Sequence, residues 1–389
     1  MSRNLKIGIV GAGLGGTTAA VALQQRGFQV VVYEQAPQLD EVGAGITVGP
    51  NATRVLAALG LEDEIQALAS ATPHVGTLDH QTAERLSYVP RGADVYLRLY
   101  GAVVRHMHRA DMHTVLLSAL DADQDCLRLD HRLVQIQQDK ERVTLQFENG
   151  QVDDCDVVVA CDGIKSLIRD RLFATEPPEF TGYVAWRGLV ERDRVPDVSV
   201  DPHFASFAAE NKNFARYPVC NGRLINYVAV ARMPDFQTES WNARADISEV
   251  LPKFAGWHKD VIQIIEATPA EGCLRWALHT RQPLNTWTEG RVTLLGDAAH
   301  PMTPFLGMGA AMAIEDAAVL ARCFEAANTD WRDALRRYER ARLDRANQVH
   351  IDSDRRGQEM FGSDPKDRAK PPGVGLDEVY MYDAMQVAI

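Results

Sequence analysis

The chain has 389 residues, of which 46% are hydrophobic and 24% charged, a balance that is ordinary for a globular protein. Its formal net charge of −12 argues against a nucleic-acid partner, which would need a basic surface, although a local basic pocket for a small anionic substrate is compatible with it. There is no signal-peptide pattern and no apolar run of the roughly 20 residues that span a membrane, so we expect a cytoplasmic protein without a membrane partner. The six cysteines show no C-x-x-C pair and no metal-ligand spacing, which favours free thiols.

The first 34 residues follow the order strand, glycine-rich turn, helix, strand, acidic residue. Residues 6–10 and 29–33 are typical of buried strands, and Gly11-Ala12-Gly13-Leu14-Gly15-Gly16 opens a helix that continues to Leu23. The first glycine permits a tight turn, the second lets a pyrophosphate approach the backbone, and the third lets the helix pack on the strand. Free N–H groups at the helix start favour phosphates, and an acid at this position accepts hydrogen bonds from a ribose. We therefore expect a dinucleotide, NAD or FAD, rather than a glycine-rich turn without a ligand, with contacts from Gly11, Gly13, Leu14, Gly15 and Glu34.

The next part of the chain mixes short strands and helices. The glycine-rich stretch at residues 43–51 is predicted to be a loop that contacts the cofactor or the substrate. A helix is expected over residues 52–59, strand segments with polar turns over 75–99, and a helix over 114–120. A hairpin is expected from 127 to 147, followed by an apolar strand at 155–160 and a helix at 167–172.

Three histidines, His106, His108 and His113, precede the helix expected at 114–120. They have neither the i, i+4 spacing of a helical zinc site nor a supporting carboxylate pattern, so we expect no metal here. Arg109, at the helix start, is better explained as an anion or cofactor contact.

From residue 179 to 280 the composition changes to alternating apolar and polar segments separated by Pro, Gly and Asp turns. Strands are expected at 183–190, 204–208, 213–219, 224–231 and 272–279, and helices at 246–254 and 259–266. The pattern predicts an α/β protein in which a Rossmann-like domain, residues 1–178, is interrupted by a mostly antiparallel sheet domain, residues 179–280. Residues 281–389 then return to the first domain and add C-terminal helices.

The returning segment carries a buried strand at 291–295 that ends in Gly296-Asp297-Ala298-Ala299-His300-Pro301. Helices are expected over 309–324 and 331–352, and a loop rich in Pro, Lys and Asp over 362–375. The second helix is explained either as a solvated helix or as a dimer face, so a monomer and a homodimer both remain open.

Two more Gly-Asp pairs at strand ends, Asp162-Gly163 and Gly296-Asp297, favour FAD over NAD, because an extended FAD has several contact points along the carboxyl edge of a parallel sheet. Asp297 is placed for the ribityl hydroxyls. The loop of residues 301–309 opens a helix whose N–H groups suit the electron-rich side of a flavin.

These motifs together resemble the class A, single-component FAD-dependent aromatic hydroxylases, with salicylate, 3-hydroxybenzoate and 6-hydroxynicotinate monooxygenases as the most similar members. The match rests on the first glycine motif, Arg109 with Asp111, Asp162-Gly163 with Ser166 and Arg169, and the motif from Gly296 to Pro301. Further matches are Pro304, Gly307, Gly309 and Glu315-Asp316. The motifs span residues 7–318 and are specific for the superfamily but poorly specific for substrate.

The resemblance implies a role for each matched position. Glu34 would bind the adenosine ribose, Arg109 the diphosphate, and Asp297 the ribityl chain. Asp162 and Gly163 belong to a motif tied to both FAD and NAD(P)H. The isoalloxazine would be cradled by Gly307, Gly309 and Ala310. NADH or NADPH would reduce the flavin, and O₂ would then give a C4a-hydroperoxide that hydroxylates a small hydroxylated aromatic or N-heteroaromatic carboxylate.

The substrate face is expected on the inserted sheet. Tyr217 matches a Tyr-Pro segment of this subgroup and is a catalytic candidate, with a core tyrosine as the alternative. Several relatives carry a histidine at the position of Asn213, and this departure leaves the proton relay open. The 6-hydroxynicotinate enzymes carry a histidine near Thr47, and its absence here argues against that exact substrate. An aromatic carboxylate needs a cation, for which Arg187, Arg216 and Arg98 are candidates. His300 and Pro301 complete the catalytic candidates, although a structural role also explains His300.

Two alternatives remain at this stage. The first is a flavin oxidoreductase of the same fold that does not insert oxygen. The second is a catalytically silent flavin-binding protein. Incorporation of oxygen from O₂ separates the first from a monooxygenase, and substrate-stimulated NAD(P)H oxidation separates the second.

Overall fold

The computed structural model describes residues 3–39, 44–121, 125–173, 176–236, 243–362 and 375–389. The loop predicted at residues 362–375 lies almost wholly outside these ranges. No helix within them combines the length and the apolar character that crossing a membrane requires.

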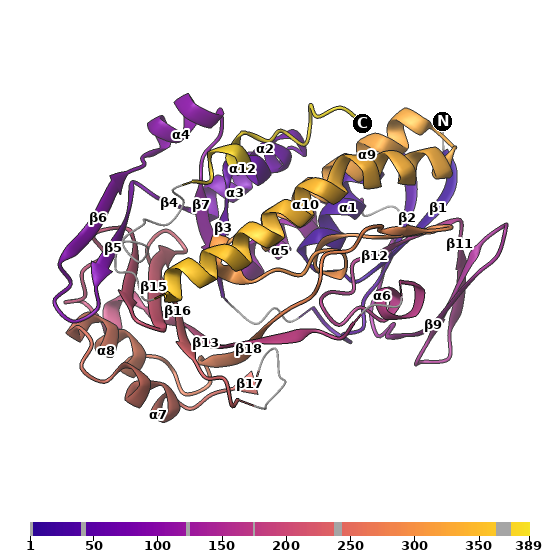
Figure 1. Ribbon diagram of the computed structural model, residues 1–389. Coiled ribbons are helices and arrows are strands. Elements are labelled where there is room, and N and C mark those ends of the chain that lie inside the picture. Colours follow the sequence, from indigo (N-terminus) through magenta and orange to yellow (C-terminus); the bar gives the residue numbers. More distant parts are fainter. Residues whose placement is uncertain (1–2, 40–43, 122–124, 174–175, 237–242, 363–374) are drawn as a thin grey trace.

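A six-stranded sheet forms the first half of the molecule (Figure 1), with the strand order β19-β20-β12-β1-β2-β8. The neighbours from β20 to β8 pair in parallel, whereas β19 is antiparallel to β20. The strand β12 and residues 7–10 of β1 are buried on both faces of the sheet, which explains their runs of Val and Ile. In sheet order the strands are Thr288–Glu289, Val292–Leu294, Val157–Ala160, Arg3–Val10, Phe28–Tyr33 and Leu127–Arg128.

An eight-stranded, mostly antiparallel sheet forms the other half, with the order β17-β18-β13-β16-β15-β14-β5-β6. The strands are Ala243–Arg244, Leu274–Thr280, Glu179–Glu191, Leu224–Arg232, Lys212–Val219, Phe204–Ala209, His74–Asp79 and Arg85–Pro90. Two of them, β5 and β6, come from before the expected domain boundary at residue 178, so this sheet extends beyond residues 179–280. The division of the chain into domains stays a prediction.

The two faces of this sheet have different neighbours because side chains alternate along a strand. On β15, Phe214 belongs to a hydrophobic cluster shared with Val250, Phe254 and Ile264 of the segments at 247–266. Asn213, Ala215 and Tyr217, at the other phase, line a cavity that faces the six-stranded sheet. The period-2 pattern of the sequence thus places one face of the sheet on a core and the other on a site.

There are two further small sheets. The sheet β3-β7-β4 (Gly45–Val48, Arg105–His108, Ser70–Ala71) contacts the eight-stranded sheet through β7 and β15. The sheet β11-β10-β9 (Val152–Cys155, Val143–Phe147, Leu133–Gln138) lies beside the six-stranded sheet, at the end away from the eight-stranded one (Figure 1). The helices in chain order are α1 (Leu14–Gln24), α2 (Pro50–Ala58), α3 (Glu62–Leu68), α4 (Ala93–Tyr100), α5 (Arg109–Ser118), α6 (Leu167–Leu172), α7 (Ile247–Val250), α8 (Lys259–Glu266), α9 (Gly309–Ala327), α10 (Trp331–Phe361) and α12 (Asp377–Met381). Short 3₁₀ turns lie at Arg192–Arg194, Leu251–Phe254, Gly296–Ala298 and Pro304–Leu306.

The structure corrects three local expectations. The glycine-rich stretch is not only a loop, because it contains β3 and the start of α2 at Pro50, a residue well suited to a first helical position. The strand expected up to residue 99 ends at Pro90, and α4 follows. Its Tyr96 and Tyr100 are buried one helical turn apart, and Gly101 ends the helix with φ 69°.

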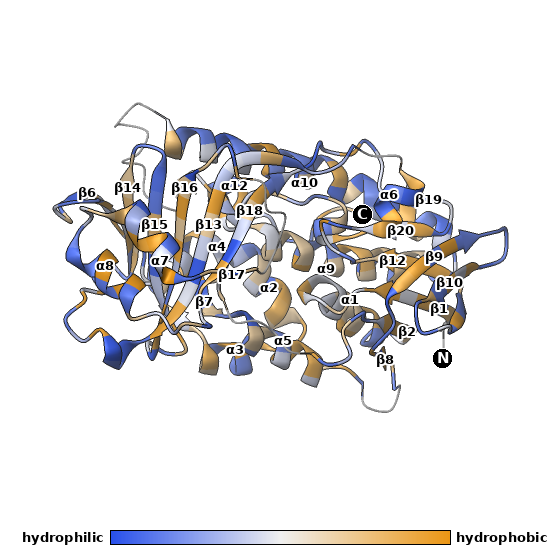
Figure 2. Ribbon diagram, turned by 90° about the horizontal axis from the view of Figure 1, so that it is seen from below, coloured by the Kyte–Doolittle hydropathy of each residue, from blue (hydrophilic) through white to orange (hydrophobic). Residues whose placement is uncertain are grey.

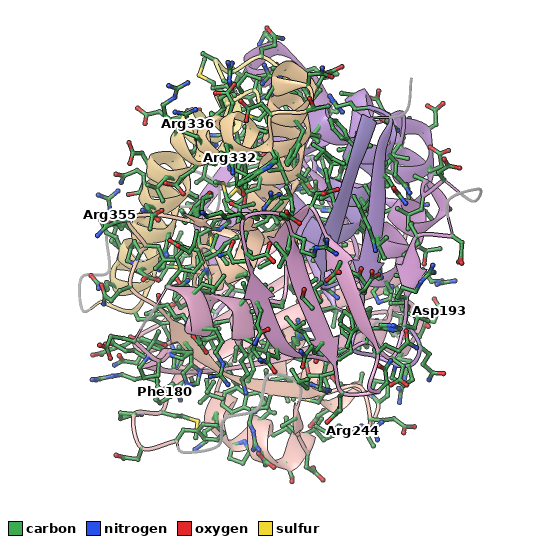
Figure 3. The ribbon with its side chains drawn as sticks, turned by 90° about the vertical axis from the view of Figure 1, so that its right-hand side faces the viewer. Phe180, Asp193, Arg244, Arg332, Arg336 and Arg355 are labelled. Atoms are coloured by element: carbon green, nitrogen blue, oxygen red, sulfur yellow. The ribbon has the colours of Figure 1, made fainter. Side chains whose placement is uncertain are left out.

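The third correction concerns α10, which continues nine residues beyond the expected end at 352, to Phe361. This helix runs from the six-stranded sheet towards the eight-stranded one (Figures 1 and 2). Its end packs Phe361 on Tyr183 of β13, with ring centroids 4.3 Å apart. Arg332, Arg336 and Arg355 point outward from it (Figure 3), as expected of an amphipathic helix with one solvated face.

Candidate active site

A cavity of about 1080 Å³ lies between the two large sheets. It is lined at one end by the carboxyl ends of β1, β2, β12 and β20, where open α/β sheets place their ligands. At the other end it is lined by the inner face of the eight-stranded sheet. Nearly all of the predicted site residues line it: Gly11, Gly13, Leu14, Gly15, Glu34, Thr47, Arg109, Asp162, Gly163, Arg187, Asn213, Tyr217, Asp297, Gly307, Gly309 and Ala310.

The glycine turn after β1 is shaped for a ligand that approaches the backbone. Gly11 has φ 106°, and a Cβ there would meet the Cys161 carbonyl oxygen at 2.3 Å, so the turn itself requires glycine. At Gly13 a Cβ would point into open space, with Arg109 Nη2 as its nearest neighbour at 4.0 Å. No side chain caps the start of α1, so its first backbone N–H groups remain available to a ligand in the cavity, close to the Arg109 guanidinium.

Glu34 is held at the same turn. One carboxylate oxygen accepts from the Ala12 N–H and the other from the Ala36 N–H, both at 2.9 Å. On the opposite side, His113 Nε2 donates to the Ala12 carbonyl oxygen at 2.6 Å. These bonds orient the glycine turn and present the remaining lone pairs of Glu34 to the cavity.

The second strand end carries an oxygen that lacks a partner. Asp162 Oδ1 is buried and has no hydrogen-bond partner among the described residues, and burial raises the pKa of this carboxyl. Ser166 caps α6 by accepting from the Arg169 N–H at 2.9 Å. Arg169 in turn donates to the carbonyl oxygens of Ala298 and Ala299. Ser166 and Arg169 therefore support the backbone of two strand ends and leave Asp162 to a ligand.

The third strand end places Asp297 opposite the start of α9. Burial raises the pKa of the Asp297 carboxyl, and the positive charges of His300 and Arg109 oppose that rise. Gly307 has φ 66°, and a Cβ on Gly309 would meet nothing closer than Asp297 Oδ1 at 3.9 Å. No side chain caps α9, so its first N–H groups are available beside Ala310.

His300 lies outside this cavity. Its Nε2 is 2.5 Å from Asp316 Oδ2, and both side chains are fully buried. Burial pushes the pKa of Asp316 up, but His300 and Arg342 outweigh it and lower the pKa to about 2. Pro301 lines a separate small cavity of about 150 Å³. These positions favour the structural explanation of His300 and lend no support to a catalytic role for either residue.

The substrate candidates converge on the inner face of the eight-stranded sheet. Tyr217 is 5% exposed and stacks on Phe204 at 5.4 Å, with an interplanar angle of 10°. Burial raises the pKa of its hydroxyl, and a side-chain hydrogen bond with Thr47 and the charge of Arg187 oppose the rise. Asn213 Nδ2 donates to Ser206 Oγ at 2.6 Å, so the amide is tied to the neighbouring strand.

The surroundings of Arg187 differ from those of the other two candidate cations, Arg216 and Arg98. It lies over the Trp276 ring at 4.7 Å, its Nε is buried without a partner, and it forms no ion pair with a described carboxylate. Burial and the nearby Arg109 lower its pKa to about 10, so it still carries a positive charge at neutral pH. Arg216 instead points to the opposite face and donates to the Pro202 carbonyl oxygen at 2.7 Å, and Arg98 is exposed on α4.

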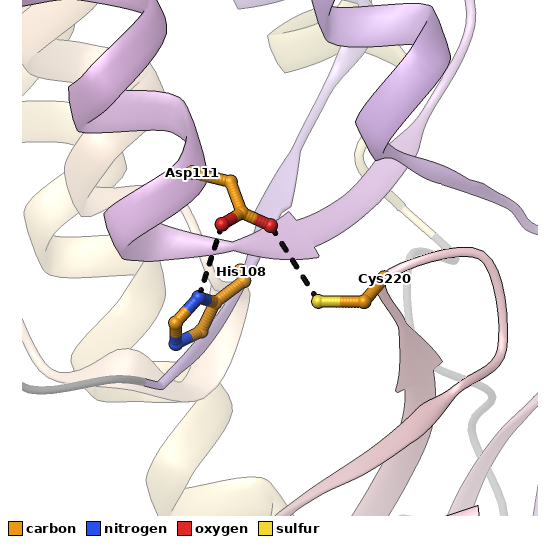
Figure 4. A group of neighbouring side chains, drawn as sticks. All are labelled: His108, Asp111 and Cys220. Carbon is orange, nitrogen blue, oxygen red and sulfur yellow. Dashed lines mark hydrogen bonds and ion pairs between the residues drawn. The ribbon is translucent and has the colours of Figure 1, made fainter.

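The three histidines considered as a metal site have separate partners. His113 contacts Ala12, and His106 enters the cavity beside Tyr217, a position that its sequence context did not reveal. His108 instead meets Asp111 and Cys220 (Figure 4). Asp111 Oδ1 is 3.4 Å from His108 Nδ1, and Asp111 Oδ2 accepts from Cys220 Sγ at 3.5 Å. These hydrogen bonds join the start of α5 to the β15–β16 turn.

The geometry defines a flavoprotein with a substrate chamber, and comparisons with known proteins agree. Residues 4–353 match the family model described as FAD binding domain. The chain is 37% identical to 3-amino-4-hydroxybenzoate 2-monooxygenase from Streptomyces platensis, covering 98% of this chain and 97% of that one. It is also 37% identical to 6-hydroxynicotinate 3-monooxygenase from Bordetella bronchiseptica, over 88% and 89% of the two chains. The protein belongs to this FAD-binding family, as a class A flavoprotein aromatic hydroxylase.

Solved structures support the same assignment. HpxO from Klebsiella pneumoniae, in complex with FAD and uric acid, superposes with a TM-score of 0.84 at 27% identity and covers 98% of this chain and 94% of that one. A salicylate hydroxylase in a substrate complex gives 0.80 at 26% identity, covering 98% and 96%.

The residues present fit FAD. One cavity holds the open space next to Gly13, the unpaired Asp162 Oδ1 and the uncapped starts of α1 and α9. These features follow the carboxyl ends of three strands of one sheet, which suits an extended ligand. The predicted fold class and cofactor are therefore confirmed.

Proposed function

We propose that this FAD-dependent monooxygenase hydroxylates a small aromatic or N-heteroaromatic ring that carries both a carboxylate and a hydroxyl group, with NADH or NADPH as the reductant. The observation that carries this substrate class is Arg187, a cation beside the cavity with a buried Nε that has no protein partner. Leaving such a donor unpaired costs free energy, which a bound carboxylate would recover through charge-assisted hydrogen bonds.

The walls around Arg187 suit a flat ring. Phe204, Val228, Val230 and Trp276 line this end of the cavity with apolar surface. Apolar walls with few polar groups bind a planar ligand by its faces, and the polar groups at its edge then fix its orientation. Tyr217 and Asn213 supply polar groups from the same face of β15, with Ala215 between them.

At the other end, we assign the adenosine ribose to Glu34, the diphosphate to Gly13, Leu14, Gly15 and Arg109, and the ribityl chain to Asp297. Bound FAD supplies the redox chemistry, taking electrons from NAD(P)H and activating O₂. The chain's own residues hold the ring close to it, exclude water and keep the hydroxyl end hydrogen-bonded.

The substrates for which the relatives are named support the substrate class. 3-Amino-4-hydroxybenzoate, 6-hydroxynicotinate and 3-hydroxybenzoate are each rings with one hydroxyl and one carboxylate, and the enzymes named for them are 32–37% identical to this chain. The particular acid, a cytoplasmic location and a monomeric or homodimeric state stay predictions.

The test is a panel of acids. The purified holoenzyme is identified by its flavin spectrum, and NADH and NADPH oxidation is then followed with hydroxybenzoates and hydroxypyridine carboxylates while peroxide is assayed in parallel. We expect one acid to stimulate oxidation strongly, with little peroxide and one atom of ¹⁸O from ¹⁸O₂ in the product. Stimulated oxidation without label in the product would favour the oxidoreductase that does not insert oxygen. No stimulation by any acid would overturn the substrate class.

A further inference from the structure

His106 of β7 is a buried titratable side chain in the substrate half of the cavity to which the proposed function gives no task. It is 1% exposed and lines the cavity. Its ring centroid lies 4.4 Å from that of Tyr217, 5.6 Å from that of Phe204 and 6.1 Å from that of His203. It therefore lies among the aromatic side chains at the substrate end of the cavity, next to Tyr217.

The two ring nitrogens of His106 have different surroundings. Nδ1 is 2.9 Å from the hydroxyl oxygen of Thr72, a residue that is only 4% exposed. No described residue forms a hydrogen bond with Nε2. Burial, together with the nearby His203, lowers the pKa of His106 to about 3, so the imidazole is neutral at physiological pH. In a neutral imidazole one nitrogen carries a proton and the other carries a lone pair. The hydrogen bonds of the two nitrogens decide which of them is protonated.

The neighbouring polar groups are already engaged. Asn213 uses its amide N–H groups on Ser206 Oγ and the Phe207 carbonyl oxygen, so its side chain is held against the neighbouring strand β14. The Tyr217 hydroxyl has Thr47 as a hydrogen-bond partner. An aromatic hydroxyl group that enters this end of the cavity thus meets His106 as the basic nitrogen closest to Tyr217 among the described residues that line it.

We propose that His106, oriented by Thr72, accepts a hydrogen bond at Nε2 from the ring hydroxyl group of the substrate and so selects hydroxylated acids over their deoxy analogues. This inference rests on the proposed function. We assign the proton to Nδ1, which then donates to Thr72 Oγ1 and leaves the lone pair of Nε2 for the ligand. A hydroxyl that donates this bond releases electron density into the ring, and electrophilic hydroxylation needs an electron-rich ring carbon. Arg187 binds the carboxylate, so the cavity has one polar partner for each of the two substituents of the ring.

Two variants at one position separate the two nitrogens. The amide of His106→Asn reaches about as far as Nδ1, so it retains a partner for Thr72 and removes the acceptor at Nε2. The longer His106→Gln places an amide oxygen near the position of Nε2. The probes are 6-hydroxynicotinate against nicotinate and 3-amino-4-hydroxybenzoate against 3-aminobenzoate. Each Kd is read from the change in the flavin spectrum of the oxidised holoenzyme.

In the wild-type holoenzyme we expect at least one hydroxylated acid to bind about tenfold or more tightly than its deoxy analogue, because a site built to pair a hydroxyl group rejects a ligand without one. His106→Asn should bring that ratio to within about twofold of one, and His106→Gln should keep most of it. A merely structural role would weaken both acids of a pair by the same factor and leave the ratio unchanged, and this result would overturn the proposal. So would equal or undetectable wild-type binding of both acids in every pair.

A second variant guards against misfolding at position 106. Thr72→Val keeps His106 and removes the group that orients it, so the ratio should fall about threefold while the deoxy acid binds as before. An unchanged ratio would contradict the assigned tautomer and the proposal with it. Because the ratio is a binding measurement, it stands apart from turnover: lost discrimination in His106→Asn without any hydroxylation in wild type would support His106 and defeat the proposed function.

Discussion

The cavity has two halves that are built in different ways. In the FAD half, the ligand groups are backbone N–H groups and single acids at strand ends, and each sits within a short sequence motif. In the substrate half, the groups come from β3 and β7 of the small sheet and from β13 and β15 of the eight-stranded sheet. These strands are distant in sequence and meet only because the two sheets pack against each other. The ligand groups of the FAD half are thus specified by short sequence motifs, and those of the substrate half by the pairing of strands that are distant in sequence.

The two glycines of the first turn test how far the FAD half is specified by its ligand. Gly13 has φ −67° and ψ −179°, a backbone that any residue adopts, and its absent Cβ would point into the cavity. Gly13→Ala should therefore fold like wild type and lose FAD affinity on the order of 100-fold, because the methyl group occupies the space of the diphosphate. Apo-protein thermal melting and FAD titration measure the two effects.

Gly11→Ala is the matched control for that prediction. Its Cβ would collide with the Cys161 carbonyl oxygen at a positive φ, so this variant should lose folded protein rather than affinity alone. FAD binding of wild-type strength by Gly13→Ala would contradict the placement of the diphosphate.

Arg187 tests the charge of the substrate half. Arg187→Met keeps the packing on Trp276 and removes the cation, and we expect the stimulating acid to bind about 30- to 150-fold more weakly, equivalent to about 2–3 kcal/mol. The carboxamide of the same acid should bind both proteins almost equally, and Arg187→Lys should recover part of the loss. Equal weakening of acid and carboxamide would show that Arg187 only shapes the wall.

The same contrast explains what the sequence could predict. Strand, glycine turn, helix and acid are contiguous, so the sequence alone nominates Gly11 to Glu34 as cofactor contacts, and a strand end nominates Asp297. The structure brings these residues to one cavity, and their roles stay predictions. The sheet alternation on β15 was readable too, yet it could not distinguish Arg187 from Arg216, since which face turns inward depends on packing against Val250 and Phe254.

From the sequence alone, His106 is a candidate only for a metal site. No neighbouring residue in the sequence indicates that β7 pairs with β3 and that His106 contacts Tyr217 of β15. His300 shows the opposite case. It lies within a motif next to the expected flavin loop, but Asp316, sixteen residues away in sequence, holds its side chain outside the cavity. Adjacency in sequence therefore brings backbone groups to the cavity, but it does not set the direction of a side chain that a residue of a distant helix holds.

Lowering the pH should decrease the free energy of unfolding, because the substrate half contains the buried His106. The pKa of His106 is lowered from its ordinary value of 6.5 to about 3 in the folded protein, so below pH 6.5 the unfolded chain binds a proton that the native state does not. Stability is then full above pH 6.5 and falls as the pH drops towards 3, by on the order of 2 kcal/mol at pH 5 from this residue.

The measurement is urea unfolding of the apo-protein between pH 5 and 7.5, in which His106→Asn should show a smaller loss of stability on acidification than wild type. His203, whose pKa burial lowers to about 4, adds a loss of the same sign that both proteins share. Parallel curves for the two proteins would mean that His106 does not titrate differently on folding.

The smallest expected effect concerns Tyr217, where the two halves act together. Tyr217→Phe keeps the stacking on Phe204 and the contact with His106 and removes only the hydroxyl that bonds Thr47, so FAD should bind normally. We expect hydroxylation to slow by about fivefold, or an increased share of NAD(P)H oxidation to end in peroxide, since one lost hydrogen bond is worth about 1 kcal/mol and loosens the ring. Product and peroxide per NAD(P)H are the readouts. Thr47→Val, which keeps the Tyr217 hydroxyl and removes its partner, should uncouple less. Unchanged coupled turnover in Tyr217→Phe would make this tyrosine a wall of the cavity, and the polar end of the substrate half would then rest on His106.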